Sequence, residues 1–197
     1  TNVICSDKTG TLTQNEMTVN HLWMMRSELK VTGEGYAPKG EIRDSKIVVT
    51  VQKSYDLELL LCGGALCTNA KLIPPEEGKD RYTVLGDPTE ACLSVAAQKG
   101  GVKLDEMIRQ YPRIMELPFD SRRKRMTTIH QLKDPFEGSR RIAFVKGSPK
   151  EVMELCQRCF DGSSSRDMND HDRERIMEAN DRYARDGLRV LAIAYRP

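Results

Sequence analysis

Apolar residues recur along the chain with two spacings, which predict a mixture of helices and strands. From Asp56 to about Ala70 the apolar positions follow helical spacing, so this segment is expected to pack one face on a core. A second amphipathic helix is expected from about Asn169 to Asp186, and it ends at Gly187. The chain therefore carries at least two core-packing helices.

Two further helices are predicted by a repeated sequence device. Gly86-Asp87-Pro88-Thr89-Glu90 follows a predicted strand at Arg81–Leu85, and Gly147-Ser148-Pro149-Lys150-Glu151 follows one at Arg140–Val145. In each case a capping residue precedes Pro at the first helical position and Glu at the third, which is the pattern of a capping box. Each strand is therefore expected to lead into a capped helix, the first of which runs to the glycine pair at positions 100 and 101.

The remaining apolar runs predict strands separated by turns. A short run at Val3–Cys5 is typical of a buried strand, and the other strands are expected at Lys46–Val51, Arg113–Leu117, Arg125–Leu132 and Leu188–Tyr195. Loops are expected at 34–44, 69–80 and 161–167, where Gly, Pro, Ser and charged residues gather. The predicted fold class is α/β of the α+β kind: an antiparallel-rich twisted β-sheet flanked by helices, without an internal repeat.

Composition limits the possible classes of protein. A chain of 197 residues with 39% hydrophobic content can form one sizeable core, or one domain with a piece of another. The net charge of +2 gives no broad basic field, so nucleic acid is not an expected partner. No apolar run is long enough to cross a bilayer, and both ends of the chain look cut because it opens without Met in a strand-like run.

The cysteines and histidines give no strong signal for a metal site. Six cysteines lie mostly in apolar segments, as reduced cysteines of a cytosolic protein do, at positions 5, 62, 67, 92, 156 and 159. Cys156 and Cys159 form a C-x-x-C pair, but a zinc site with the other two is disfavoured by their spacing and by the lack of a nearby histidine. No role is assigned to His21, His130 or His171.

Candidate chemistry concentrates in the run from Asp7 to Thr13, DKTGTLT. An aspartate at the end of a strand, followed by a turn rich in amides and hydroxyls, can attack phosphorus and form an acyl phosphate. A lone Asp-x-x-Gly would more safely be read as a simple turn at Gly10. Seven residues in this order are far more specific.

The stretch from Cys5 to Met17, CSDKTGTLTQNEM, resembles the phosphorylation signature of P-type ATPases. The resemblance implies that Asp7 is phosphorylated by ATP, that Lys8 stabilises the phosphoryl group, and that Thr9 helps to hold phosphate and Mg²⁺. Asp7 and Thr9 would then be Mg²⁺ ligands of an incomplete site, because the later Thr-Gly-Asp and Gly-Asp-Gly-x-Asn-Asp motifs of the family are absent from this chain.

Four more segments resemble the nucleotide-binding domain of the same family, in the expected order: 86–90 (GDPTE), 119–126 (FDSRRKRM), 146–149 (KGSP) and 187–192 (GLRVLA). The resemblance implies an ATP site formed by Glu90, Phe119, Arg123, Lys124, Lys146, Gly147 and Arg189.

Each of these residues also has an ordinary structural explanation. Phe119 is either a core residue or a platform for adenine, and Glu90 either completes a capping box or meets the adenine amino group. Lys146 is a solvated lysine or faces phosphate or the purine edge. Arg123 and Lys124 form a solvated basic face or a nucleotide contact, and Arg189 is a surface arginine or reaches the phosphates.

The resemblance divides the chain and places it in a larger protein. Residues 1–24 are expected to be a phosphorylation-domain strand with the DKTGT motif and a hinge, and residues 25–197 the nucleotide-binding domain. The parent would be an integral membrane protein with this part in the cytosol, coupling ATP hydrolysis to cation transport. Residues 32–40 (TGEGYAPKG) resemble calcium-pump members, which favours Ca²⁺. The isolated chain is expected to bind ATP but to turn it over negligibly.

Two other classes remain open at this stage. A stand-alone phosphatase of the haloacid-dehalogenase type shares the Asp-x-x-x-Thr strand end, but it would need a second aspartate cluster in this chain. A non-catalytic nucleotide-binding module is compatible with the four later motifs.

Overall fold

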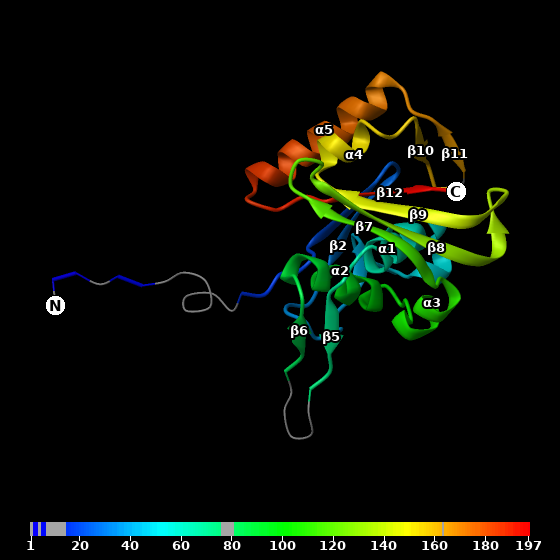
Figure 1. The fold of residues 1–197 in the computed structure, drawn as a ribbon. Coiled ribbons are helices and arrows are strands. Elements are labelled where there is room, and N and C mark those ends of the chain that lie inside the picture. Colours follow the sequence, from blue (N-terminus) through cyan, green and yellow to red (C-terminus); the bar gives the residue numbers. More distant parts are fainter. Residues whose placement is uncertain (1, 4, 7–14, 76–80, 163) are drawn as a thin grey trace.

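The computed structural model describes residues 2–3, 5–6, 15–75, 81–162 and 164–197. Its largest sheet has four antiparallel strands in the order β12-β9-β8-β7 (Figure 1). These strands span Arg113–Asp120 (β7), Arg125–Phe136 (β8), Ser139–Gly147 (β9) and Ala192–Arg196 (β12). The strands β7, β8 and β9 follow one another as hairpins, whereas β12 returns from the C-terminal part of the chain to pair with β9.

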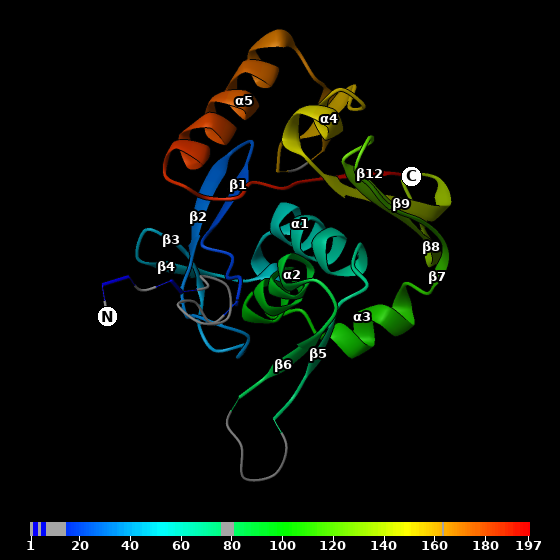
Figure 2. The same cartoon turned by 60° about the vertical axis from the view of Figure 1, so that its left-hand side comes forward.

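A second antiparallel sheet is formed near the N-terminus in the order β1-β2-β3-β4. Its strands are His21–Met24 (β1), Ser27–Val31 (β2), Ile42–Asp44 (β3) and Ile47–Val49 (β4). Helices α1 (Tyr55–Leu66) and α2 (Pro88–Lys99) lie between the two sheets in Figure 2, and α3 (Leu104–Gln110) follows α2. One hydrophobic cluster joins all three layers, since it contains buried residues of both sheets and of α1 and α2.

The packing of α1 on the large sheet requires a glycine. An added Cβ at Gly63 would lie 2.8 Å from a ring carbon of Phe144 on β9 and 2.9 Å from Ile193 on β12. The helix therefore approaches the sheet more closely than any side chain would allow, and its carboxyl end is fixed beside β8 and β9.

The C-terminal part of the chain covers the other end of the molecule. It contains α4 (Pro149–Met153), the hairpin of β10 (Arg158–Phe160) and β11 (Ser165–Asp167), and the long helix α5 (Asp170–Arg185). Helix α5 packs on the first hairpin, where Arg175 donates to the carbonyl of Met25 (2.9 Å) and Tyr183 lies against His21 with ring centroids 5.3 Å apart. Residues far apart in the sequence thereby hold the hairpin in place.

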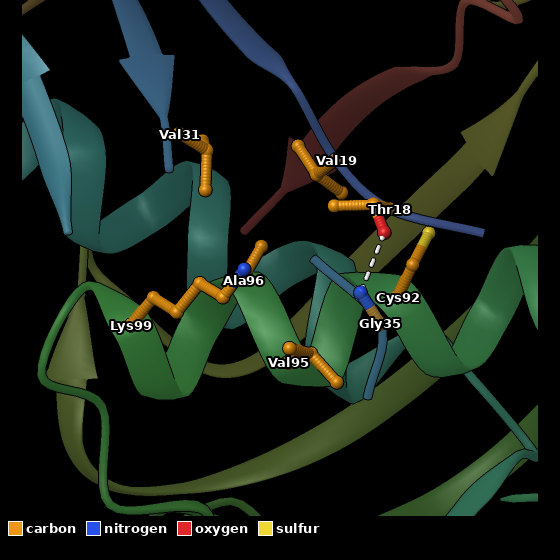
Figure 3. A pocket seen from close by; sticks show the side chains of 8 residues that line it. All are labelled: Thr18, Val19, Val31, Gly35, Cys92, Val95, Ala96 and Lys99. Carbon is orange, nitrogen blue, oxygen red and sulfur yellow. Dashed lines mark hydrogen bonds between the residues drawn. The ribbon is translucent and has the colours of Figure 1, made fainter. Parts of the chain in front are cut away.

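The segment before β1 is anchored on α2 and on the loop after β2 (Figure 3). The backbone amide of Gly35 donates to Thr18 Oγ1 (3.1 Å), and Lys99 Nζ donates to the carbonyl of Gly33 (2.8 Å). The aliphatic stem of Lys99 runs along the same hollow as Val31 and Val95. The chain therefore enters the domain along a fixed path from Thr18 onwards.

Several sequence predictions need correction. The helix predicted over 56–70 ends at Leu66, because Cys67 leaves the helical conformation and its sulfur donates to the carbonyls of Met126 and Phe144. The helix after Ser148 has only five residues, and Ser148 Oγ donates to Glu151 instead of capping a backbone amide. The predicted buried strand at Val3–Cys5 includes a residue outside the described ones, and Val3 and Cys5 themselves are exposed without a partner strand among the described residues.

Other elements were not predicted at all. They include the strands β1, β2, β10 and β11 and the helix α3. Strand β3 occupies the end of a predicted loop, β5 (Lys71–Ile73) lies in another and pairs with the predicted strand β6 (Thr83–Leu85), and the 3₁₀ turn Val51–Lys53 lies where the end of a strand was expected. Each is short and carries too few residues to show a period. Within the described residues, no helix combines the length and the apolar character that a bilayer span requires.

Candidate functional site

The candidate site begins at the first turn of α2, where the sequence pattern sets the local structure. Asp87 caps the helix, since its Oδ1 accepts a hydrogen bond from the amide of Thr89 (2.7 Å), and Pro88 occupies the first helical position. Glu90, at the third position, does not complete a capping box. Its side chain turns instead toward β9, where Lys146 Nζ donates to Oε1 over 2.8 Å.

This ion pair is largely removed from solvent, with side-chain exposure of 7% for Lys146 and 16% for Glu90. The second carboxylate oxygen of Glu90 accepts from Thr68 Oγ1 (3.0 Å) and from the amides of Asn69 (2.7 Å) and Ala70 (3.1 Å). Burial alone would raise the pKa of Glu90, but the hydrogen bonds from Lys146 and the Asn69 amide outweigh it and lower the pKa. The group is a carboxylate with one oxygen saturated and the other bound only to Lys146 among the described residues.

Phe119 lies in the same row of the sheet as this pair. Lys146 is paired with Met126, and the pairing of β7 with β8 is irregular between Leu117 and Asp120, which leaves Pro118 and Phe119 together opposite Met126. Neighbouring strands are about 4.8 Å apart, so the backbones of Lys146 and Phe119 are about 10 Å apart. The ring of Phe119 is 61% exposed, which excludes the alternative that it is a core residue.

The turn between β7 and β8 is rigidly built. Asp120 Oδ1 accepts from the amides of Arg122 and Arg123 (both 2.9 Å), and these bonds, the Arg123 one foremost, lower the pKa of Asp120. The Arg123 guanidinium donates back to the carbonyl of Pro118 (2.9 Å). Lys124 has a φ of +50°, and its ammonium reaches Glu151 at the start of α4 (2.7 Å).

Gly147 is required because this turn lies directly on it. A Cβ at Gly147 would meet the carbonyl oxygen of Lys124 at 2.4 Å and Cβ of Arg125 at 2.6 Å. The amide of Ser148 donates to the same Lys124 carbonyl (3.0 Å). The end of β9 and the turn after Phe119 are therefore one packed unit.

Arg189 lies near the first turn of α2. Its side chain is exposed and donates to Thr89 Oγ1 over 3.4 Å. The pKa of Asp87 is lowered mainly by its hydrogen bonds with Thr89, which outweigh the effect of burial, and to a smaller extent by the charge of Arg189. The Arg189 side chain is therefore at the amino end of α2, where it contacts Thr89, the residue before Glu90.

The structure thus gathers most of the predicted site residues at one place. Glu90 and Lys146 are in direct contact, Gly147 contacts Lys124, and Phe119 and Arg123 belong to the same hairpin as Lys124. Asp7, Lys8 and Thr9 lie outside the described residues. Four polar residues that the sequence did not single out also belong here: Thr68, Asn69, Arg113 and Glu116.

A separate hollow of about 210 Å³ lies between α1 and the far end of the β8–β9 hairpin. It is lined by aromatic and aliphatic side chains, among them Tyr55, Tyr111 and Phe136, and by Glu58 and Lys133. None of the predicted site residues lines it. The candidate site is instead an open surface whose features are an exposed ring, a buried ion pair and surrounding basic groups.

Comparison with known proteins now places the chain. A family model described as "P-type ATPase, cytoplasmic domain N" matches residues 56–197. The chain belongs to the P-type ATPase family. The chain is 40% identical over 197 residues to a calcium-transporting ATPase of Bacillus subtilis (strain 168), a match that covers 99% of this chain and 21% of that protein.

Other relatives agree with this assignment. The cation-transporting ATPase pma1 of Synechocystis is 37% identical, covering 98% of this chain and 21% of its own length. The calcium-transporting ATPase type 2C member 1 of Homo sapiens is 33% identical, and the match covers 100% of this chain and 20% of that protein. The chain spans about a fifth of the length of these curated relatives. The predicted family and the predicted α+β fold with antiparallel sheets and flanking helices are therefore confirmed.

Proposed function

We propose that this N domain binds ATP on the surface formed by Phe119, Glu90 and Lys146, and that its parent couples ATP hydrolysis to cation transport. The observation that carries the ATP proposal is the Glu90–Lys146 pair, which stands in one row of the sheet with an exposed aromatic ring. Leaving a phenylalanine 61% exposed forfeits hydrophobic burial, and a flat ligand that stacks on the ring would recover it.

The charges of the pair fit adenine better than guanine. Adenine carries an amino group, a donor, at the position where guanine carries the acceptor O6. Glu90 Oε1 has Lys146 as its one described partner and can accept a second hydrogen bond, from that amino group. Guanine O6 is an acceptor and cannot donate to the carboxylate, so the contact with Glu90 would be lost. The pair therefore selects ATP over GTP.

The basic residues around the pair suit the triphosphate. Arg123 and Lys124 belong to the turn that follows Phe119, and Arg189 lies at the amino end of α2. The exposed ammonium of Lys124 is engaged by Glu151, so a phosphate would compete with that carboxylate for it. Because the surface is open and part of its charge is already paired, we expect an affinity of about millimolar order.

The phosphorylation step is carried over from the sequence motif. We propose that residues 1–24 supply the phosphorylation-domain strand, the DKTGT motif and a hinge, with residues 25–197 as the N domain. Asp7 would receive the γ-phosphoryl group, Lys8 would stabilise it, and Thr9 with Asp7 would help to hold Mg²⁺. The transported ion is proposed to be Ca²⁺, since the relatives from Bacillus subtilis and Homo sapiens are named calcium-transporting ATPases. The parent would then be a membrane protein with this part in the cytosol.

The ATP proposal is tested by titrating the chain with ATP and with GTP, using amide chemical shifts to measure affinity. Phe119→Ala and Lys146→Met are compared with Ile114→Ala, an exposed apolar residue of the same strand. Loss of the stacking surface, or of the ammonium that holds Glu90 Oε1 in place, is expected to weaken ATP binding about tenfold, while Ile114→Ala leaves it unchanged. Unchanged ATP affinity in both site variants would refute the proposed site.

The cation proposal is tested on the parent protein in sealed vesicles. ATP-dependent uptake of calcium that is lost in the Asp7→Asn variant is the expected result. Uptake that persists in that variant would contradict the role of Asp7.

A further inference from the structure

The turn from Cys67 to Ala70 connects α1 to β5 and is held from two sides. On one side Glu90 accepts hydrogen bonds from the amides of Asn69 and Ala70 and from the hydroxyl of Thr68. On the other side Arg113, the first residue of β7, donates to the carbonyls of Leu66 (2.8 Å) and Thr68 (2.6 Å). The turn is therefore clamped between a carboxylate and a guanidinium.

The guanidinium is itself fixed in a closed ring of hydrogen bonds. Arg113 also donates to Asn69 Oδ1 (2.6 Å) and to Glu116 (3.0 Å), and Asn69 Nδ2 donates to Glu116 Oε1 (2.7 Å). The planar fork of arginine can serve these acceptors at once, whereas the point charge of a lysine cannot. The side chains of Arg113 and Glu116 are only 30% and 27% exposed, so solvent does not compete freely for these bonds.

We propose that Arg113 is a positioning residue of the nucleotide site. Arg113 is not one of the residues proposed to contact the nucleotide. It fixes the turn whose amides donate to Glu90 Oε2, and through that oxygen it determines the direction in which Oε1 points. This inference rests on the proposed function, because it assigns the recognition of adenine to Glu90. Arg113 shares strand β7 with Phe119, so one strand fixes both the stacking ring and the acceptor for the base.

A purely structural role for Arg113 makes a different prediction. The carbonyls of Leu66 and Thr68 lie at the carboxyl end of α1, and basic side chains commonly satisfy such groups. If helix capping were its whole role, removing Arg113 would lower stability but leave the folded protein with unchanged affinity and unchanged ATP/GTP selectivity. A positioning role must instead act through Glu90.

The test is a double-mutant cycle with Arg113→Gln, Glu90→Gln and the two combined, with Arg109→Ala as a control at an exposed arginine of α3. Dissociation constants for ATP and GTP are measured on folded protein well below its unfolding temperature. Arg113→Gln is expected to weaken ATP about fivefold while GTP changes by less than about twofold, and to have almost no further effect when Glu90→Gln is already present.

Each other outcome decides between the two roles. Unchanged ATP affinity in Arg113→Gln, or effects of Arg113→Gln and Glu90→Gln that simply multiply, would overturn the positioning role. If Glu90→Gln itself leaves ATP and GTP binding unchanged, the assignment of the base to Glu90 fails, and this inference fails with it. In that case, a loss of ATP affinity in Phe119→Ala would still support the proposed ATP site, but Arg113 would have no positioning role in it.

A second variant keeps the test decisive if Arg113→Gln does not fold. Asn69→Ala removes the side-chain hydrogen bonds to Arg113 and Glu116 but keeps the backbone amide that donates to Glu90. The variant should fold, because the Asn69 side chain is exposed. It is expected to weaken ATP about two- to threefold and to lose that effect in the Glu90→Gln background. Affinity equal to that of the wild type would overturn the inference.

Discussion

Replacing Lys146 by methionine should separate the stability of the domain from its binding of nucleotide. The substitution keeps an apolar stem of similar length in a site that is 7% exposed, and it removes the one cation that contacts Glu90 Oε1 among the described residues. Glu90 is left as a partly buried carboxylate. Removing one partner of a buried ion pair typically costs about 3–5 kcal/mol.

The cost at this site should fall at the lower end of that range. Three donors remain on Glu90 Oε2, from Thr68, Asn69 and Ala70, so the carboxylate is not stripped of hydrogen bonds. We expect Lys146→Met to lower the free energy of unfolding by about 3 kcal/mol, and the double variant with Glu90→Gln to lose about 2 kcal/mol less than the sum of the single variants. The assay is urea unfolding followed by the fluorescence of Trp23, the single tryptophan of the chain.

The matched control is Lys99→Met, which also removes a buried ammonium. Lys99 is 8% exposed, and its ammonium donates to one carbonyl, that of Gly33, with no carboxylate paired to it among the described residues. Its removal should cost only about 1 kcal/mol. A Lys146→Met variant within about 0.5 kcal/mol of the wild type, or no more costly than Lys99→Met, would refute the view that an ion pair, and not burial alone, determines the cost.

The same variant should change the response of stability to pH. The folded-state pKa of Glu90 lies below its ordinary value of 4.5, so its contribution to stability is present above about pH 4.5 and is lost as the pH falls through the folded pKa. Lys146→Met removes a main cause of that lowering. Its free energy of unfolding should therefore fall less steeply than that of the wild type below pH 4.5, and parallel curves would contradict the assigned cause.

Three further predictions concern other parts of the fold. Gly147→Ala places a Cβ 2.4 Å from the Lys124 carbonyl and should cost about 2 kcal/mol, measured as a lower urea midpoint; an unchanged midpoint would show that the turn can move away. Asn169→Ala removes the cap of α5, where Oδ1 accepts from the Asp172 amide (2.9 Å), and should cost about 1 kcal/mol in thermal unfolding, whereas a cost near zero would mean that water replaces the cap. Burial lowers the pKa of His130, so its contribution is full above about pH 6.5 and is lost as the pH falls below that value; His130→Gln should flatten this decline, and an equal decline would assign it to another group.

The sequence predicted the long elements and missed several of the short ones, for a physical reason. Helices α2 and α5 were placed to within a residue or two, because caps such as Asp87 and Asn169 and the apolar period are local signals. The 3₁₀ turn, α3 and the three-residue strands β3 and β5 are too short to show a period, and β5 gains its hydrogen bonds from β6, whose residues begin ten positions after Ile73. The carboxyl end of α1 is determined by contacts of Cys67 with carbonyls 59 and 77 residues later in the chain.

The candidate site shows the same division. The residues that family motifs name could be proposed in advance, but their contacts could not. The pairing of Glu90 with Lys146 spans 56 positions, and the bonds of Arg113 to Asn69 and to the Thr68 carbonyl span 44 and 45 positions. Asn69, Arg113 and Glu116 carry no local pattern that distinguishes them from surface residues. The turn from Cys67 to Ala70 comes to lie between Glu90 and Arg113 only when α1 packs against the sheet.

The site is built from the ends of elements whose middles form the core, and this separates the roles of its residues. Phe119 is mostly exposed and contributes little to folding, so its removal should affect binding almost alone. Glu90 and Lys146 belong to both functions, because the pair that faces the proposed base also joins α2 to β9. Arg113 joins two further elements, because it hydrogen-bonds the end of α1 from the start of β7. Weak, reversible binding of a nucleotide is what such a surface supports, since the ligand gains one ring face and one polar edge while the core beneath stays unchanged.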